Sequence, residues 1–209
     1  MQIISHRGYW KTAAEKNGIV AFNRSFSLGF GTETDLRDYA GEIVISHDMA
    51  DANSINCDEL FTIFCQYNPH LPLALNVKAD GLQSKLKGLV NKYGIDNYFV
   101  FDMSIPDTIG YLKQGLRFFS RQSEYEPVPA FYTDCAGVWL DAFEGTWYDA
   151  DLIHAHINKG KEVAIVSPDL HKREVTGLWN LLKETGTHQL EGLILCTDIP
   201  EDAVTFFNA

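Results

Sequence analysis

Short apolar runs alternate with amphipathic segments along almost the whole chain. Residues 2–6 form an apolar run that ends near a glycine, and residues 71–77 are apolar until Asn76, so both are typical of buried strands. Residues 82–93 are predicted to be a helix that Gly94 ends. The predicted strands are 2–6, 32–36, 42–46, 71–77, 98–101, 116–120, 137–140, 162–166 and 193–196. The predicted helices are 20–28, 58–66, 82–93, 106–113, 149–158, 174–184 and 202–207.

The strand at residues 42–46 follows a tight turn at Tyr39-Ala40-Gly41, so it is counted as a hairpin extension of the strand before it. Eight strand units then alternate with helices, and such alternation indicates parallel strands joined by crossover connections. The pattern predicts an α/β fold, a compact (β/α)8 barrel in which residues 1–209 form one domain. A doubly wound open sheet is the alternative.

The charge balance narrows the classes of partner. The 209 residues include 28 acidic and 17 basic side chains, a formal net charge of −11, which disfavours nucleic acid and anionic lipid surfaces as extended partners. Four cysteines without a C-x-x-C pair favour buried free thiols. No apolar run approaches ~20 residues, so a cytoplasmic protein without membrane insertion is the expectation. The oligomeric state is not indicated.

Polar side chains stand at the ends of the predicted strands, where the active sites of barrels lie. His6 and Arg7 follow the first strand, and Glu33 and Asp35 lie on the second. Being two residues apart, the two acids point to the same side of a strand, roughly 6.6 Å apart along it, and they repel each other unless a cation lies between them. Oxygen ligands suit Mg²⁺ or Ca²⁺. An isolated E-x-D is more often an exposed pair, but its neighbours here favour a metal.

Two histidines and two cations complete this group of residues. His6 and His47 each follow an apolar run, and imidazole, with an ordinary pKa of about 6.5, serves as acid or base. Arg7 offers a planar fork for phosphate oxygens, and Lys78 a point charge. A dication, two cationic side chains and two imidazoles fit attack at a phosphoryl centre. The predicted partner is therefore a small phosphodiester.

The first 48 residues resemble the glycerophosphodiester phosphodiesterase family of phospholipase C-like barrels. The matching motifs are His6-Arg7-Gly8, Glu33-Thr34-Asp35 and His47-Asp48, with weaker matches at Asn76-Val77-Lys78 and Thr197-Asp198. The resemblance implies that His6 and His47 are the general acid and base, that Glu33 and Asp35 bind a divalent ion, and that Arg7 holds phosphoryl oxygens. It also implies a phosphomonoester and an alcohol as products, and a role in lipid metabolism.

The sequence departs from this family at two positions near the proposed metal. The usual P-E-N-T segment is replaced by Glu15-Lys16-Asn17-Gly18, and the acid two residues before the lysine of the third strand is Asn76. An amide oxygen binds Mg²⁺ or Ca²⁺ more weakly than a carboxylate. Glu124 or Asp141, at later strand ends, can supply the further carboxylate, and Glu124 is preferred.

Two other functions fit the same residues. The first is a lyase that releases a cyclic phosphate after attack by a neighbouring substrate hydroxyl. The second is a barrel that binds phosphate ligands and has weakened catalysis, suggested by Asn76. The alcohol groups of the substrate are not indicated, although the short chain leaves little room for a large lid and favours a small diester over a membrane lipid.

Overall fold

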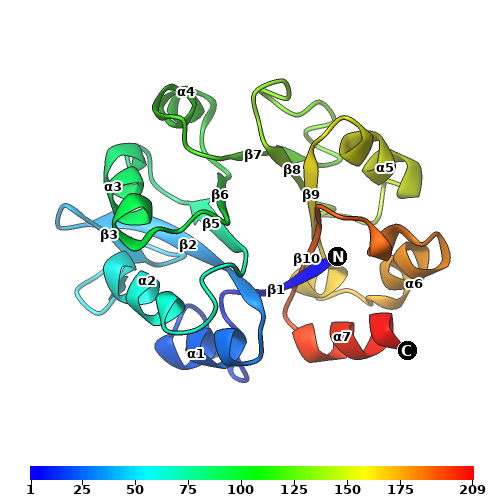
Figure 1. Cartoon of the computed structure of the whole chain (residues 1–209), viewed down its shortest axis with the longest axis horizontal. Coiled ribbons are helices and arrows are strands. Elements are labelled where there is room, and N and C mark those ends of the chain that lie inside the picture. The colour runs from blue at the N-terminus through cyan, green and yellow to red at the C-terminus, as the bar shows by residue number, and fades with distance from the viewer. The chain divides into compact units, whose positions relative to one another are not determined.

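The computed structural model describes all 209 residues, which fall into two compact units (Figure 1). The N-terminal unit comprises residues 5–118, and the C-terminal unit comprises residues 1–4 and 119–209. The boundary passes through the first strand, β1 (Gln2–His6). The prediction that residues 1–209 form one domain stays a prediction.

The N-terminal unit is built on the long strand β2 (Gly31–Tyr39). Its strand order is β4-β3-β2-β5-β6, with β2, β5 and β6 parallel. β3 returns antiparallel to β2 through a tight turn in which Ala40 and Gly41 both have positive φ, as a two-residue hairpin requires. The other strands are β3 (Glu42–Ile45), β4 (Ile55–Asn56), β5 (Leu73–Val77) and β6 (Tyr98–Phe101).

Four helices of this unit connect and accompany the strands (Figure 1). They are α1 (Ile19–Ser27), α2 (Cys57–Cys65), α3 (Gln83–Tyr93) and α4 (Ile105–Gln114). Their ends follow from local chemistry. The side chain of Asn56 caps α2 by accepting from the Asp58 N–H, and Gly94 and Gly115 end α3 and α4 in the left-handed conformation.

The C-terminal unit has the strand order β10-β9-β8-β7, and all three pairs are parallel. The strands are β7 (Phe119–Gln122), β8 (Gly137–Leu140), β9 (Glu162–Val166) and β10 (Leu193–Thr197). The helices are α5 (Ala150–Asn158), α6 (Thr176–Glu184) and α7 (Pro200–Asn208), and three short 3-10 turns occur at Ala13–Glu15, Pro168–His171 and Thr187–Gln189. Buried apolar side chains of β8, β9, β10 and α6 form one core in this unit.

The alternation predicted from the sequence is confirmed, with shifts at the ends of elements. β2 runs to Tyr39, three residues further than predicted, because its end pairs with β3. β7 begins at Phe119 rather than Leu116, and the two-residue β4 was not predicted. All four cysteines are free. None of the helices is long and apolar enough to span a membrane, and the cytoplasmic location stays a prediction.

Candidate active site

The turn after β1 places two of the predicted residues, His6 and Arg7. Arg7 has a φ of 59°, and its backbone N–H donates to the carbonyl of Glu33 at 2.9 Å. Gly8 follows with a φ of 77°, and its N–H donates to the Thr32 hydroxyl at 2.9 Å. A Cβ on Gly8 would lie 2.7 Å from the Cβ of Ala21 on α1, so only glycine fits. The motif thus folds β1 against β2 and α1 at once.

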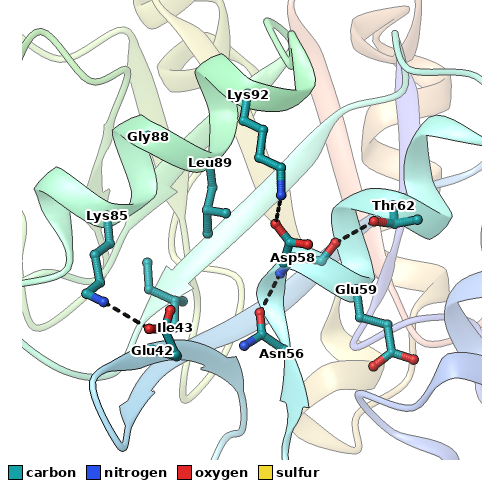
Figure 2. A pocket seen from close by; sticks show the side chains of 10 residues that line it. All are labelled: Glu42, Ile43, Asn56, Asp58, Glu59, Thr62, Lys85, Gly88, Leu89 and Lys92. Atoms are coloured by element: carbon teal, nitrogen blue, oxygen red, sulfur yellow. Dashed lines mark hydrogen bonds and ion pairs between the residues drawn. The ribbon is translucent and has the colours of Figure 1, made fainter.

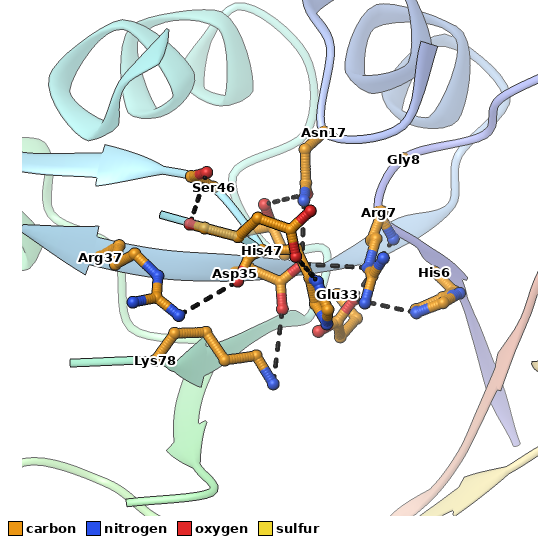
Figure 3. Close-up of polar contacts among 12 residues, drawn as sticks. His6, Arg7, Gly8, Asn17, Glu33, Asp35, Arg37, Ser46, His47 and Lys78 are labelled. Carbon is orange, nitrogen blue, oxygen red and sulfur yellow. Dashed lines mark hydrogen bonds and ion pairs between the residues drawn. The ribbon is translucent and has the colours of Figure 1, made fainter. Parts of the chain in front are cut away.

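Strand β2 carries the two acids of the site, Glu33 and Asp35, in fully buried positions. Nε2 of His6 lies 3.9 Å from Oε2 of Glu33. Nε of Arg7 lies 3.0 Å from Oδ2 of Asp35, and Nζ of Lys78 lies 3.7 Å from Oδ1 of the same carboxylate. Figure 3 shows the two acids with His6, Arg7 and Lys78 around them. The structure therefore brings together five of the residues that the sequence singled out.

The carboxyl of Glu33 is poorly stabilised as an anion by these neighbours. Burial raises the pKa of Glu33 well above its usual range, and the charge of Asp35 raises it further. The charges of Arg7 and Lys78 and a hydrogen bond from Asn76 lower the pKa without offsetting the burial. An additional cation at this point would stabilise the charged form of Glu33.

Three oxygen-bearing side chains at this point fit a hard divalent cation. Asp35 and Asn76 are paired in register on β2 and β5. Oδ1 of each is buried without a hydrogen-bond partner, and buried oxygens of this kind are normally satisfied. No group of three or more His, Cys, Asp or Glu side chains is gathered as a metal site. The fitting set is therefore two carboxylates and one amide, Glu33, Asp35 and Asn76, and carboxylate and amide oxygens suit Mg²⁺ or Ca²⁺.

His47 lies in the segment after β3, and 46% of its side chain is exposed. Its Nδ1 lies 2.9 Å from a carboxylate oxygen of Asp48, and its carbonyl accepts a hydrogen bond from Arg37. His47 and Arg7 line one pocket of about 450 Å³. Each of the two predicted acid–base histidines, His6 and His47, therefore has a carboxylate beside one ring nitrogen.

Asn17 is a site residue that sequence reasoning did not assign to a role. Its backbone is left-handed, with a φ of 57°, and its N–H donates to the carbonyl of Arg7 at 2.9 Å. Its side chain accepts from the Thr34 hydroxyl at 2.8 Å and donates to Oδ2 of Asp35 at 2.9 Å (Figure 3). Asn17 thus orients the carboxylate of Asp35. The only sequence signal was its place in the segment that stands where the family has P-E-N-T.

Glu124, the remaining predicted metal ligand, belongs to the C-terminal unit. Its Oε1 accepts the N–H of Glu144 at 2.6 Å. Burial raises its pKa, but the backbone amides of Glu144, Glu124, Phe143 and Gly145 outweigh this effect and lower the pKa of Glu124 overall. In its own unit Glu124 therefore binds the backbone amides of the loop at residues 143–145, and its role as a metal ligand stays a prediction.

The alternative carboxylate, Asp141, follows β8 in the same unit. Its Oδ1 lies 2.8 Å from Nε2 of His171 and accepts the N–H of Ala142 at 2.8 Å. Through Oδ1, Asp141 thus fixes an imidazole and the start of a loop.

A second pocket, of about 700 Å³, lies between α2, α3 and β3 and contains none of the predicted site residues (Figure 2). Both of its lysines are paired with acids. Lys92 forms an ion pair with Asp58, and Nζ of Lys85 lies 3.3 Å from Oε1 of Glu42. Because both lysines are neutralised locally, this pocket offers no uncompensated cation for a phosphate.

Comparison with known proteins shows which solved structures share this fold. No family model and no curated protein matches the sequence. Among solved structures, a proposed glycerophosphodiester phosphodiesterase from Galdieria sulphuraria is 19% identical, with a TM-score of 0.76 over 100% of this chain and 98% of that one. The glycerophosphodiester phosphodiesterase of Thermotoga maritima is 16% identical, with a TM-score of 0.69 over 97% and 96%. A Ca²⁺-dependent phosphatidylinositol-specific phospholipase C from Streptomyces antibioticus is 10% identical, with a TM-score of 0.61 over 99% and 96%. The chain has the fold of these phosphodiesterases, which confirms the predicted (β/α)8 barrel class.

Proposed function

We propose that this chain is a metal-dependent phosphodiesterase of the glycerophosphodiester phosphodiesterase kind. It cleaves a small phosphodiester to a phosphomonoester and an alcohol. The observation that carries the proposal is the group formed by His6, Arg7 and Lys78 around the buried Glu33 and Asp35. The shared fold supports the same reaction class, because phosphodiesterases are found among the similar structures.

The divalent ion, Mg²⁺ or Ca²⁺, would be held by the oxygens of Glu33, Asp35 and Asn76, with Glu124 as the further ligand that the sequence suggests. Such an ion supplies charge stabilisation to the phosphoryl oxygens when it is bound. The Oδ1 atoms of Asp35 and Asn76, which accept no hydrogen bond, and the raised pKa of Glu33 support this assignment.

The chain's own residues have separate roles in the proposed reaction. Arg7 and Lys78 bind the non-bridging phosphoryl oxygens, since both cations lie at the edge of the acid pair. His6 and His47 exchange protons with the attacking water and the leaving alcohol, and Glu33 and Asp48 keep their rings oriented. Asn17 holds Asp35 in place by donating a hydrogen bond to its Oδ2.

Substitution of the two histidines tests this assignment. We expect His6→Ala and His47→Ala each to lower kcat on bis(p-nitrophenyl) phosphate by about 10²–10⁴-fold in Mg²⁺ or Ca²⁺, the usual contribution of a general acid or base. His70→Ala is the matched control, because 79% of the His70 side chain is exposed and its ring nitrogen lies 4.0 Å from the exposed Asp96, away from the proposed site residues. Equal turnover by His6→Ala and the wild type would refute the proposed mechanism.

A further inference from the structure

The pocket lined by Arg7 and His47 also takes residues from two loops of the N-terminal unit. One wall is the segment 13–18, and the other is the segment 45–55. Its volume of about 450 Å³ is within the range of small-molecule sites. Because the pocket starts at proposed catalytic groups, one part of a bound substrate would enter it.

The polar lining of this pocket is rich in donors and cations. The lining includes Arg7, Lys16, Asn17 and Asn53. Asp48 is the one acid in the lining. Its side chain is 94% exposed, and its Oδ1 lies 2.9 Å from Nδ1 of His47. Arg7 is paired with the buried Asp35, so Lys16 supplies the remaining positive charge of the lining, on a chain whose formal net charge is −11.

Lys16 has no carboxylate partner, unlike most cations nearby. The acid next to it in sequence, Glu15, is taken by Arg24, whose Nη1 lies 2.8 Å from Oε2. The half-buried Lys16 instead places its ammonium 4.3 Å from the ring centroid of Trp10. A cation–π contact fixes the position of an ammonium without neutralising its charge. Arg7, the other cation of the lining, is paired with Asp35, so an anion that entered the pocket would meet the charge of Lys16 without displacing a carboxylate from it.

We propose that this pocket binds a second anionic group, carried by the alcohol portion of the substrate, and that Lys16 is the residue that selects for it. The substrate class is then a phosphodiester in which one alcohol bears a terminal phosphate or carboxylate. This inference rests on the proposed phosphodiesterase function and adds the charge of the substrate to it.

Three matched diesters test the proposal: glycerophosphoglycerol, the same molecule with a terminal phosphate, and glycerophosphoglycerate with a terminal carboxylate. We expect wild-type kcat/KM to be higher for the two charged diesters than for the neutral one. Lys16→Met keeps the length of the side chain and removes its charge. It should lower the ratio of charged to neutral kcat/KM by about tenfold, mainly through KM, the loss of one charged hydrogen bond. The two charged diesters distinguish a phosphate site from a carboxylate site.

Two further variants isolate the charge of Lys16. Lys16→Arg should restore most of the ratio, and Lys113→Met, on the exposed face of α4, should leave the ratio unchanged. Wild-type cleavage of all three diesters with an unchanged ratio in Lys16→Met would overturn the inference and leave the proposed function standing.

If the wild type cleaves none of the diesters, the proposed function fails. Calorimetric titration with phosphate-bearing glycerophosphoglycerol then tests whether the pocket binds an anionic group. Weaker binding by Lys16→Met than by the wild type supports the second anionic group. Equal binding overturns it.

Discussion

The contribution of Glu33 to folding stability depends on whether a cation is bound beside it. Its pKa is raised by burial and by Asp35, so the folded chain without metal keeps the proton more tightly than the unfolded chain does. Such a group favours folding below its unfolded pKa of about 4.5 and loses that contribution as the pH rises through its folded pKa. At neutral pH the ionised form of Glu33 therefore works against folding.

Replacing Glu33 by glutamine should consequently stabilise the metal-free protein. We expect the Tm of Glu33→Gln in EDTA at pH 7.5 to exceed that of the wild type by a few degrees, with the difference shrinking towards pH 4.5. Glu59→Gln, an exposed acid on α2, should change the Tm little and serves as the control. A lower Tm for Glu33→Gln in EDTA would show that the ion pairs of the site, rather than burial, determine the state of Glu33.

Added Ca²⁺ or Mg²⁺ should reverse this order, because only the wild type keeps the carboxylate ligand. The wild-type Tm should then rise with metal concentration by mass action, and the Tm of Glu33→Gln should rise much less.

The site residues that could be predicted from the sequence are those whose position on a strand, or at its end, already indicates their role. Glu33 and Asp35 are two apart on a strand, and His6 and Arg7 end one, so their positions follow from the period of the backbone. Asn17 and Lys16 were not assigned because their roles depend on a loop. The left-handed turn at Asn17 and the contact of Lys16 with Trp10 leave no periodic signal.

At the scale of elements, the junction from β1 to α1 depends on Gly8. We expect Gly8→Ala to lower the Tm by roughly 5–10 °C, since it combines a strained positive φ with a Cβ 2.7 Å from Ala21. Gly81→Ala is the matched control. Gly81 has a φ of 89° but open space around it, so only the backbone strain, roughly 2–4 °C, should appear. Equal losses in the two variants in thermal melts would show that the close packing on Ala21 is not important.

The ends of two helices could be predicted from single residues. Gly94 and Gly115 mark the ends of α3 and α4 through their own left-handed backbone, a property of one residue that the sequence displays. A strand end depends on its partner instead. β7 begins at Phe119, where Gly137 of β8 faces it, although the apolar run starts at Leu116. The two-residue β4 exists only because it pairs with β3 and has no hydrophobic signal of its own.

At the scale of the whole molecule, an acidic chain concentrates cations where the proposed substrate binds. Arg7 and Lys78 contact Asp35, and Lys16 lines a pocket with Arg7, whereas the cations of the larger pocket are paired with acids outside the proposed site. The fold class followed from the alternation of strands and helices. The substrate did not, because the pocket that selects it is formed by two loops whose mutual placement depends on packing.

The central claim is that the chain cleaves a phosphodiester with a divalent ion, and phosphorus NMR of the reaction tests it most directly. Purified wild-type protein is incubated with a glycerophosphodiester in Ca²⁺, in Mg²⁺, and in EDTA. The account predicts that the diester signal gives way to a phosphomonoester signal with metal, and that EDTA stops the change. A cyclic phosphate that accumulates as the end product would indicate the lyase reaction instead. A diester signal that stays unchanged in both metals would contradict the account.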